Sequence, residues 1–171
     1  MSNPKSDIKV CVVTGVGPGT GKAIVERFVA GGYRVAMLAR NVERLTSIEK
    51  DLKGAYAFPC DVTDTDVLAE TIAAIRVKLG IPTVVIHNAV GGAFGSFREI
   101  EPAILATGNT AAYVAIDAVI DVPWTRKRLS EAPDDFFCKP ADIAGECYHL
   151  AHQPRSAWSN EVVLRPFGEN W

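Results

Sequence analysis

The strongest constraint on the fold is a regular alternation of short apolar runs and amphipathic helical segments in the first half of the chain. The apolar runs are rich in β-branched residues, which is typical of buried strands, and they cover residues 8–13, 34–39, 55–58 and 83–87. Strands that are apolar on both faces and alternate with helices form parallel sheets with helices on both sides. We therefore predict an α/β fold built on a doubly wound parallel sheet.

Capping residues mark where the expected helices begin and end. Gly31 and Gly32 are suited to end the first helix, and Asn41 and Asp64 are suited to cap the second and third. The second helix is expected to run to about Leu52. The apolar residues at helical spacing should face the sheet, and they are Ile24, Val25, Phe28 and Val29, then Leu45 and Ile48, then Val67, Leu68, Ile72, Ile75 and Leu79.

The alternation stops after Asn88. A glycine-rich stretch follows, and the next expected strand is Tyr113–Ile116. A parallel crossover needs a dozen or more residues and usually contains a helix, yet the intervening residues contain no full-length amphipathic helix. A short helix over 123–132, a helix over 140–150 and a strand over 160–165 are expected further on. The sheet should therefore be truncated in its second half.

Charge and composition exclude several classes of function. The formal net charge is −2, without long blocks of one sign, which argues against nucleic-acid binding. No apolar run is long enough to span a bilayer, and residues 1–7 are polar, so we expect no membrane insertion and a cytoplasmic location. The 4 cysteines are scattered and should be buried thiols. No metal site is expected, because nothing completes a ligand set with Cys147, His149 and His152.

A glycine cluster lies between the first expected strand and the first expected helix. Its spacing excludes the Walker pattern and the GxGxxG pattern, and it fits Thr-Gly-x-x-x-Gly-x-Gly. Glycines let a backbone turn sharply and approach a pyrophosphate, whose charge the helix N-terminus favours. The predicted phosphate-binding residues are Thr14, Gly15, Gly17, Pro18, Gly19, Thr20 and Gly21.

Three elements in this order resemble the short-chain dehydrogenase/reductase family: the glycine cluster, Cys60-Asp61-Val62-Thr63, and Asn88-Ala89 followed by Gly91. Residues 139–171 are also similar to the end of such enzymes. The resemblance implies a Rossmann-like sheet and hydride transfer between a nicotinamide and a carbonyl or alcohol carbon. It places Asp61 and Val62 near the adenine and adds Asn88, Ala89 and Val90 to the cofactor site. His87 and Val90 depart from the family's Asn-Asn-Ala-Gly element.

Cofactor preference is read at the end of the second strand, where NAD-selective sites carry an acidic side chain. This strand instead ends in Arg40 and Asn41. Arg40 can pair with a 2′-phosphate through charge-assisted hydrogen bonds. We therefore predict that NADP(H) is preferred over NAD(H), with Arg40 and Asn41 at the cofactor.

The family's acid/base motif, Tyr-x-x-x-Lys, is absent from the chain. The residues four positions after the tyrosines at 33, 56, 113 and 148 are Met37, Cys60, Asp117 and His152. Residues 107–110 are similar to the start of the family's serine-bearing segment, and the flanking helices look deleted near Ala106 and near residues 111–113. The catalytic residues are therefore unknown, and Ser96, Thr107 and Thr110 can only orient a carbonyl.

These observations predict one Rossmann-like domain over residues 1–171, with a cofactor-binding half (1–97) and a shortened second half (98–171). The predicted function is an NADP(H)-dependent oxidoreductase that is catalytically impaired in this form and acts on a small carbonyl or alcohol, which the sequence does not identify. A non-catalytic NADP(H)-binding or scaffold protein is the alternative, and a nucleotide-sugar or methyl-transfer protein is a weaker one. A homo-oligomer is left open, and loss of the family's interface helices is expected to expose apolar surface.

Overall fold

The computed structural model describes residues 9–89 and 112–167. They form two compact units, of which one contains residues up to Ala89 together with Pro140–Tyr148, and the other contains the remaining residues. No helix in these ranges is long and apolar enough to cross a membrane. The organisation of residues 1–171 as a single domain stays a prediction.

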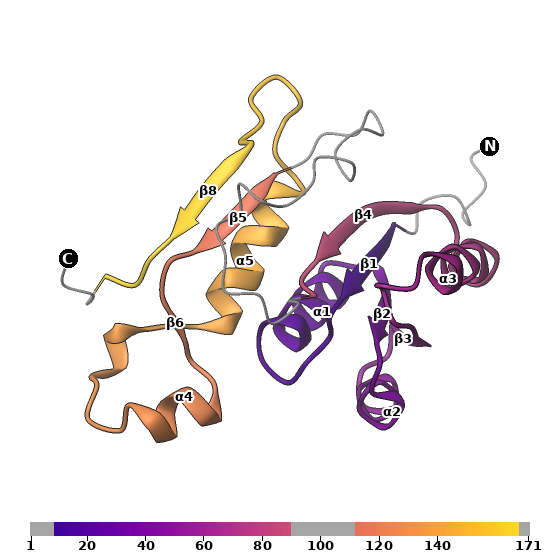
Figure 1. Ribbon diagram of the computed structural model, residues 1–171. Helices are drawn as coiled ribbons and strands as arrows, with labels where there is room; N and C mark the ends of the chain where they lie inside the picture. Colours follow the sequence, from indigo (N-terminus) through magenta and orange to yellow (C-terminus); the bar gives the residue numbers. More distant parts are fainter. Residues whose placement is uncertain (1–8, 90–111, 168–171) are drawn as a thin grey trace. The chain divides into compact units, whose positions relative to one another are not determined.

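The first unit is built on a four-stranded parallel sheet with the order β3-β2-β1-β4 (Figure 1). Its strands are β1 (Val10–Thr14), β2 (Arg34–Ala39), β3 (Ala55–Pro59) and β4 (Pro82–His87). The helices α1 (Thr20–Ala30), α2 (Val42–Asp51) and α3 (Thr65–Lys78) alternate with them. This arrangement confirms the predicted α/β fold with parallel strands.

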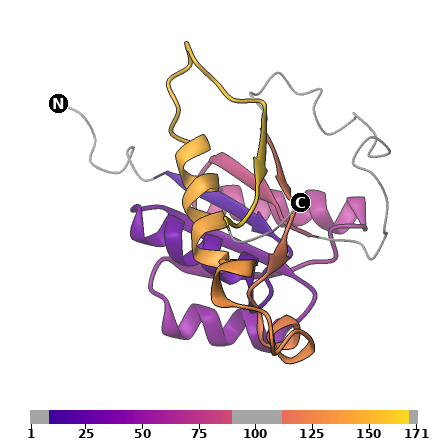
Figure 2. The same cartoon turned by 90° about the vertical axis from the view of Figure 1, so that its left-hand side faces the viewer.

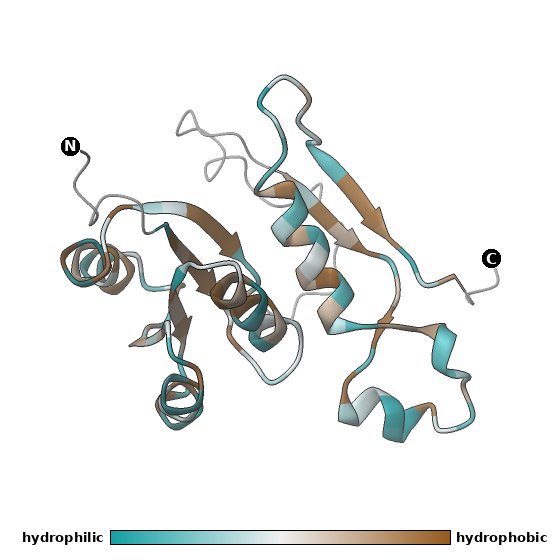
Figure 3. Cartoon of the chain, turned by 180° about the vertical axis from the view of Figure 1, so that it is seen from behind, coloured by the Kyte–Doolittle hydropathy of each residue, from teal (hydrophilic) through white to brown (hydrophobic). Residues whose placement is uncertain are grey.

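One face of this sheet packs on α3. Side chains along β1 and β2 point alternately to the two faces of the sheet, so that Val10, Val12, Ala36 and Leu38 share this face. Together with Ile75 of α3 they form a buried cluster, in which Leu68 and Ile72 are partly buried. Figure 3 shows that the strands of the sheet are mostly hydrophobic. Val67 was predicted to face inward but is 40% exposed, because it lies in the first turn of α3 and is not part of the buried cluster.

The opposite face packs on α1 and α2. The helix α5 (Pro140–Leu150), whose residues 140–148 belong to the same unit, lies against α1 (Figure 2). Tyr148 is the main contact of α5, because its ring lies edge-on to Phe28 and Tyr33, and Arg27 covers it at 3.8 Å from the ring centroid. Gly31 follows α1 at this point, and a Cβ there would overlap the Tyr148 ring. A residue far along the sequence therefore completes the core of the first unit.

Most element boundaries agree with those predicted from the sequence. Asn41 and Asp64 cap α2 and α3, and Leu45 and Ile48 are buried as expected. The strand β1 ends one residue later than predicted, and the helix predicted over 123–132 ends early, as α4 (Pro123–Arg128). The strand β4 has alternating exposure, with Val85 64% exposed. In the described residues β4 pairs only with β1, which makes it an edge strand.

The second unit contains two parallel strand pairs. The predicted strand β5 (Tyr113–Ile116) pairs with the predicted last strand, β8 (Glu161–Leu164). The pair β6 (Val119–Ile120) and β7 (Phe137–Cys138) was not predicted, because two-residue strands are too short to show a periodicity.

Of the four cysteines, Cys11, Cys60 and Cys138 are buried, as expected, whereas Cys147 is half-buried.

A network of four charged side chains links the segments between β6 and α5. Arg126 forms two hydrogen bonds with the Asp121 carboxylate, at 2.6 and 2.8 Å, and also pairs with Asp134. Lys139 Nζ lies 2.8 Å from oxygens of both carboxylates. Hydrogen bonds from Arg126 and then Lys139 lower the pKa of Asp121, and bonds from Lys139 and then Arg126 lower that of Asp134. Asp121 thus links α4 and the residue after β7 to the end of β6.

We expect Asp121→Asn to destabilise the second unit by about 1–2 kcal/mol, since one carboxylate that bonds two cations is lost. The wild-type stabilisation should be present above the unfolded-state pKa of about 4 and should be lost as the pH falls further, because the folded-state pKa is depressed. Denaturant unfolding followed by tryptophan fluorescence measures both effects, since Trp124 and Trp158 lie in this unit. Asp135→Asn is the matched control, and an equal loss in that variant would contradict the assignment.

Candidate functional site

The candidate site lies at the carboxyl edge of the four-stranded parallel sheet. In such sheets ligands bind outside the carboxyl ends of the strands, where the loops to the following helices begin. All of the predicted cofactor residues that the structure describes lie at or just after these strand ends: Thr14 as the last residue of β1, Gly15, Gly17, Pro18, Gly19, Thr20 and Gly21 after it, Arg40 and Asn41 after β2, Asp61 and Val62 after β3, and Asn88 and Ala89 after β4. Val90 lies outside the described residues.

The glycine loop is packed against the end of β4. Gly15 has a φ of +68°, which favours glycine, and a Cβ there would lie 2.5 Å from the Ala89 Cα. A Cβ at Gly21 would lie 2.8 Å from the carbonyl oxygen of Gly15 and 2.9 Å from the Cα of Val16. These two glycines therefore allow the turn after β1, the residues after β4 and the start of α1 to approach one another more closely than larger residues would permit.

Hydrogen bonds hold the turn after β1 against the neighbouring strand ends. The Asn88 side-chain amide donates to the carbonyl oxygen of Gly15 at 2.9 Å, and the N–H of Val16 donates to the carbonyl oxygen of Leu38 at 3.3 Å. The buried Thr14 hydroxyl lies 3.0 Å from Nδ1 of His87. His87, a departure from the family's asparagine, thus bonds the end of β1 to the end of β4.

The N-terminus of α1 follows this loop. Gly19 is the N-cap residue, and no side chain caps the helix. The first N–H groups of a helix have no partner within it, and they favour a negatively charged group together with the helix dipole. A Cβ built on Gly17 would meet no atom within 4 Å, so space remains beside the loop. The arrangement can hold a phosphate group by backbone N–H donors.

The ends of β2 and β3 are polar. Arg40 is exposed directly after β2, and the Asn41 side chain caps α2 by accepting the N–H of Arg44 at 2.8 Å. The carboxylate of Asp61 accepts hydrogen bonds from the backbone and side chain of Thr63, which lower its pKa, and Arg40 lowers it further by charge attraction. Val62 is partly buried against the core on the α3 face.

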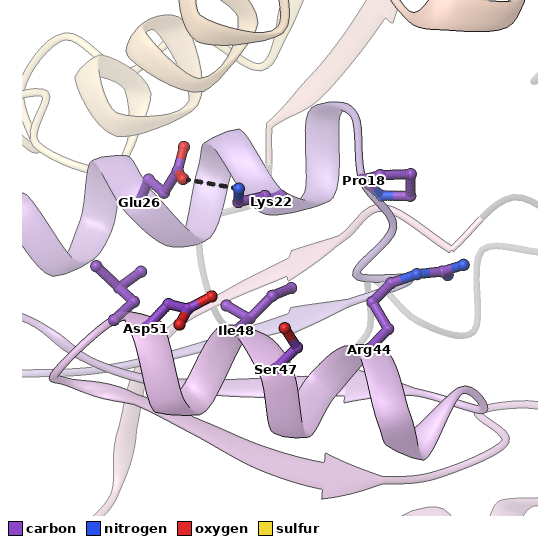
Figure 4. A pocket seen from close by; sticks show the side chains of 8 residues that line it. Pro18, Lys22, Glu26, Arg44, Ser47, Ile48 and Asp51 are labelled. Atoms are coloured by element: carbon purple, nitrogen blue, oxygen red, sulfur yellow. Dashed lines mark ion pairs between the residues drawn. The ribbon is translucent and has the colours of Figure 1, made fainter.

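A hollow between α1 and α2 adjoins the glycine loop (Figure 4). It contains one residue that the sequence reasoning missed, Arg44, whose side chain extends toward the loop that carries Pro18 (Figure 4). Lys22 also lines the hollow and forms an ion pair with Glu26 at 3.5 Å. The sequence signal that could have revealed Arg44 is a second arginine one helical turn after Arg40.

Three tyrosines of the first unit lie away from this edge. Tyr33 precedes β2 and contacts Tyr148, and Tyr56 lies near the start of β3. The helix α1, with 11 residues, separates the glycine loop from the Tyr33 and Tyr148 rings by roughly 16 Å. Burial raises the pKa of Tyr33, which disfavours its phenolate. Tyr113 belongs to the second unit, and Ser96, Thr107 and Thr110 lie outside the described residues.

The described residues contain no group of three or more histidine, cysteine or acidic side chains that could hold a metal ion. Burial raises the pKa of Cys147 to about 11 and that of Cys11 still further. At neutral pH both side chains are therefore thiols and weak nucleophiles.

The chain is similar to known oxidoreductases in sequence and to solved members of their family in fold. The family model described as short chain dehydrogenase matches residues 9–116. An uncharacterized oxidoreductase from Caenorhabditis elegans is 33% identical over 100 residues, which is 55% of this chain and 32% of that protein. The human 3-oxoacyl-[acyl-carrier-protein] reductase is 37% identical over 73 residues, which is 42% of this chain and 31% of that protein.

The chain thus spans about a third of the length of these curated relatives. A solved structure of a variant of actinorhodin polyketide ketoreductase with NADPH is similar in fold, with a TM-score of 0.75 and 17% identity, over 97% of this chain and 98% of that chain. The family model covers more than half of the residues, and the observed strand order and glycine loop are consistent with that match. The chain belongs to the short-chain dehydrogenase family.

Proposed function

We propose that this chain binds a nicotinamide dinucleotide at the carboxyl edge of its sheet, prefers NADP(H), and carries out its family's hydride transfer to a small carbonyl compound, or from an alcohol, only weakly or not at all. The observation that carries the proposal is the glycine loop. Gly15 and Gly21 bring its backbone against β4, while the N-terminus of α1 has no side-chain cap. A pyrophosphate is the group that uses both features.

The residues at the strand ends fit the rest of a dinucleotide. The pyrophosphate would lie along Gly17, Pro18, Gly19 and Thr20. The loop would be supported by the contacts of Asn88 and Ala89 with Gly15. Asp61 and Val62 follow β3, where the family holds the adenine. Arg40 and Asn41 follow β2, so that this strand does not end in the acidic residue that bonds the ribose hydroxyls in NAD-selective sites. The solved ketoreductase that shares this fold contains NADPH, which supports the same class of cofactor.

Hydride transfer to a carbonyl carbon leaves an alkoxide, which must be protonated as it forms. A positioned acid contributes about 10²–10⁴-fold to such a step. In the first unit the tyrosines lie away from the glycine loop, and none of the chain's four tyrosines has a lysine four residues later. When bound, the cofactor would supply the hydride, but the sequence lacks the Tyr-x-x-x-Lys pair that would supply a tuned acid for the proton. A non-catalytic NADP(H)-binding protein is therefore the second candidate.

The loop assignment predicts that Gly19→Val abolishes measurable NADPH binding, because a branched side chain would fill the space in front of the α1 N–H groups. Titration of the full chain with NADPH, followed by nicotinamide fluorescence, measures the affinity, and thermal unfolding reports the fold. Gly145→Val is the matched control, since a Cβ there meets no atom within 4 Å and the residue lies in α5. Unchanged affinity in the Gly19 variant would contradict the assignment.

The selectivity assignment predicts that Arg40→Asp reverses the preference from NADPH toward NADH. The loss of a charge-assisted hydrogen bond costs about 1.5–3 kcal/mol, which is a factor of roughly 10–150 in affinity. The ratio of the two dissociation constants is the quantity to measure. Lys50→Glu makes the same change in charge at the far end of α2 and should leave the ratio as it is. An equal ratio in the Arg40 variant and the wild type would show that Arg40 does not contact the 2′-phosphate.

The missing acid predicts that NADPH oxidation by the purified chain stays at background with a panel of aldehydes, ketones and β-ketoesters. The rate should fall at least about 10²-fold below that of an ordinary enzyme, because proton delivery and substrate positioning are both impaired. Absorbance at the nicotinamide band follows the reaction. Turnover at an ordinary rate would refute impairment, and Tyr113→Phe would then test whether that tyrosine supplies the proton.

A further inference from the structure

The amino edge of the four-stranded sheet, opposite the glycine loop, gathers positive charge from segments that are far apart in the sequence. Because the strands are parallel, their first residues share this edge, and α2 and α3 end just before β3 and β4 begin. The cations in the segments that lead into the four strands are Lys9, Arg34, Lys50, Lys53, Arg76 and Lys78. The acidic residues of these segments are Glu49 and Asp51.

Little of this charge is neutralised within the unit. The four lysines and Arg76 are exposed. Arg34 is partly buried and donates to the carbonyl oxygen of Leu79 at 3.4 Å. Within residues 9–89 the structure forms a single ion pair, which joins Lys22 to Glu26 on α1 and involves none of these cations. Glu49 instead accepts the backbone N–H of Ala57 at 3.1 Å. The amino edge therefore carries a net positive charge, although the whole chain has a formal charge of −2.

The helix dipole accounts for part of this pattern. Cations in the last turn of a helix interact favourably with its C-terminus, which explains Lys50, Arg76 and Lys78. It does not explain Lys9 and Lys53, which directly precede β1 and β3 and lie outside any helix. Their charges are therefore free to attract an anion from outside the chain.

Two apolar side chains are exposed among these cations. Val77, in the last turn of α3, is 90% exposed, and Ile81, directly before β4, is 70% exposed. The neighbouring Ile75 and Leu79 are buried against the sheet, so that Val77 lies on the outer side of the helix. The six cations together with Val77 and Ile81 are called the amino-edge surface. A partner that fits it has negative charge and a place for apolar side chains.

The composition of the amino-edge surface favours a lipid membrane over a folded protein as that partner. Four of its six cations are lysines. Lysine is depleted in protein–protein interfaces, where arginine and aromatic residues are enriched. At the surface of a membrane with anionic lipids, each lysine or arginine contributes through its charge alone, without a fixed geometry. Val77 and Ile81 could enter the boundary between headgroups and acyl chains, which takes up exposed apolar side chains.

We propose that the amino-edge surface binds anionic lipid membranes peripherally, with its cations at the headgroups and Val77 and Ile81 at the boundary with the acyl chains. Charge complementarity supplies most of the attraction, so that binding weakens as the salt concentration rises. The proposal is independent of the dinucleotide site. That site lies at the other end of strands of five or six residues, roughly 17 Å away, and would face away from the bilayer.

Sedimentation of the full chain with vesicles tests the proposal. The chain should bind vesicles of phosphatidylcholine with phosphatidylserine and should not bind vesicles of phosphatidylcholine alone. Lys53→Gln and Arg76→Gln should each weaken binding about fivefold, because each cation near an anionic surface contributes roughly that factor. Lys127→Gln is the matched control, since it removes one exposed cation from α4 in the second unit and should leave binding unchanged. Val77→Ser should weaken binding without changing its salt dependence, and thermal unfolding reports the fold of each variant.

Four results would overturn the proposal: equal binding to neutral vesicles, unchanged binding in both cation variants, an equal loss in Lys127→Gln, or equal affinity for polyglutamate or a short DNA duplex that the same variants abolish. The last result would show a general polyanion site instead of a membrane surface. Titration with NADPH separates this inference from the dinucleotide proposal. Lys53→Gln should bind NADPH as the wild type does, and a wild type that binds NADPH but no vesicles would refute the membrane proposal alone.

Discussion

The arrangement of the candidate site depends on one close backbone contact, between the turn after β1 and the residues after β4. Gly15 makes this contact possible, since its positive φ and its lack of a Cβ let the turn lie against Ala89. Asn88 then closes the contact with a hydrogen bond to the carbonyl oxygen of Gly15. The contact sets where α1 begins, and the start of α1 sets the direction of its N–H groups. The phosphate-binding capacity is thus a consequence of sheet packing.

Much of this unit could be predicted from the sequence because its signals are local. Valine-rich runs and capping residues such as Asn41 and Asp64 act within a few residues, and the strands and helix starts predicted from them were confirmed. The glycine loop lies between β1 and α1, where the sequence placed it. The predictions were weaker where a residue's environment depends on distant segments. Val67 has helical spacing but lies beyond the cluster on α3, and β4 has an apolar sequence but stands at the edge of the described sheet.

Long-range contacts were missed for the same reason. The pairs β5–β8 and β6–β7 join segments separated by other elements, and the network around Asp121 unites residues whose charges alone gave no pattern. At the site, the sequence indicated Arg40 from its place after a strand but gave no sign that Arg44 extends toward the loop.

The packing of Tyr148 on α1 also bears on how the chain folds as it is synthesised. The sheet strands and α1–α3 are complete by His87, and the rings of Phe28 and Tyr33 already contact each other there, yet Tyr148, the third ring of this cluster, comes from α5. A contact that spans more than half of the chain forms late, because the conformational entropy of closing a long loop must be lost before the contact contributes any stabilisation. Until residue 148 has left the ribosome, a nascent chain exposes these rings. That interval is the one in which a chaperone would be needed most.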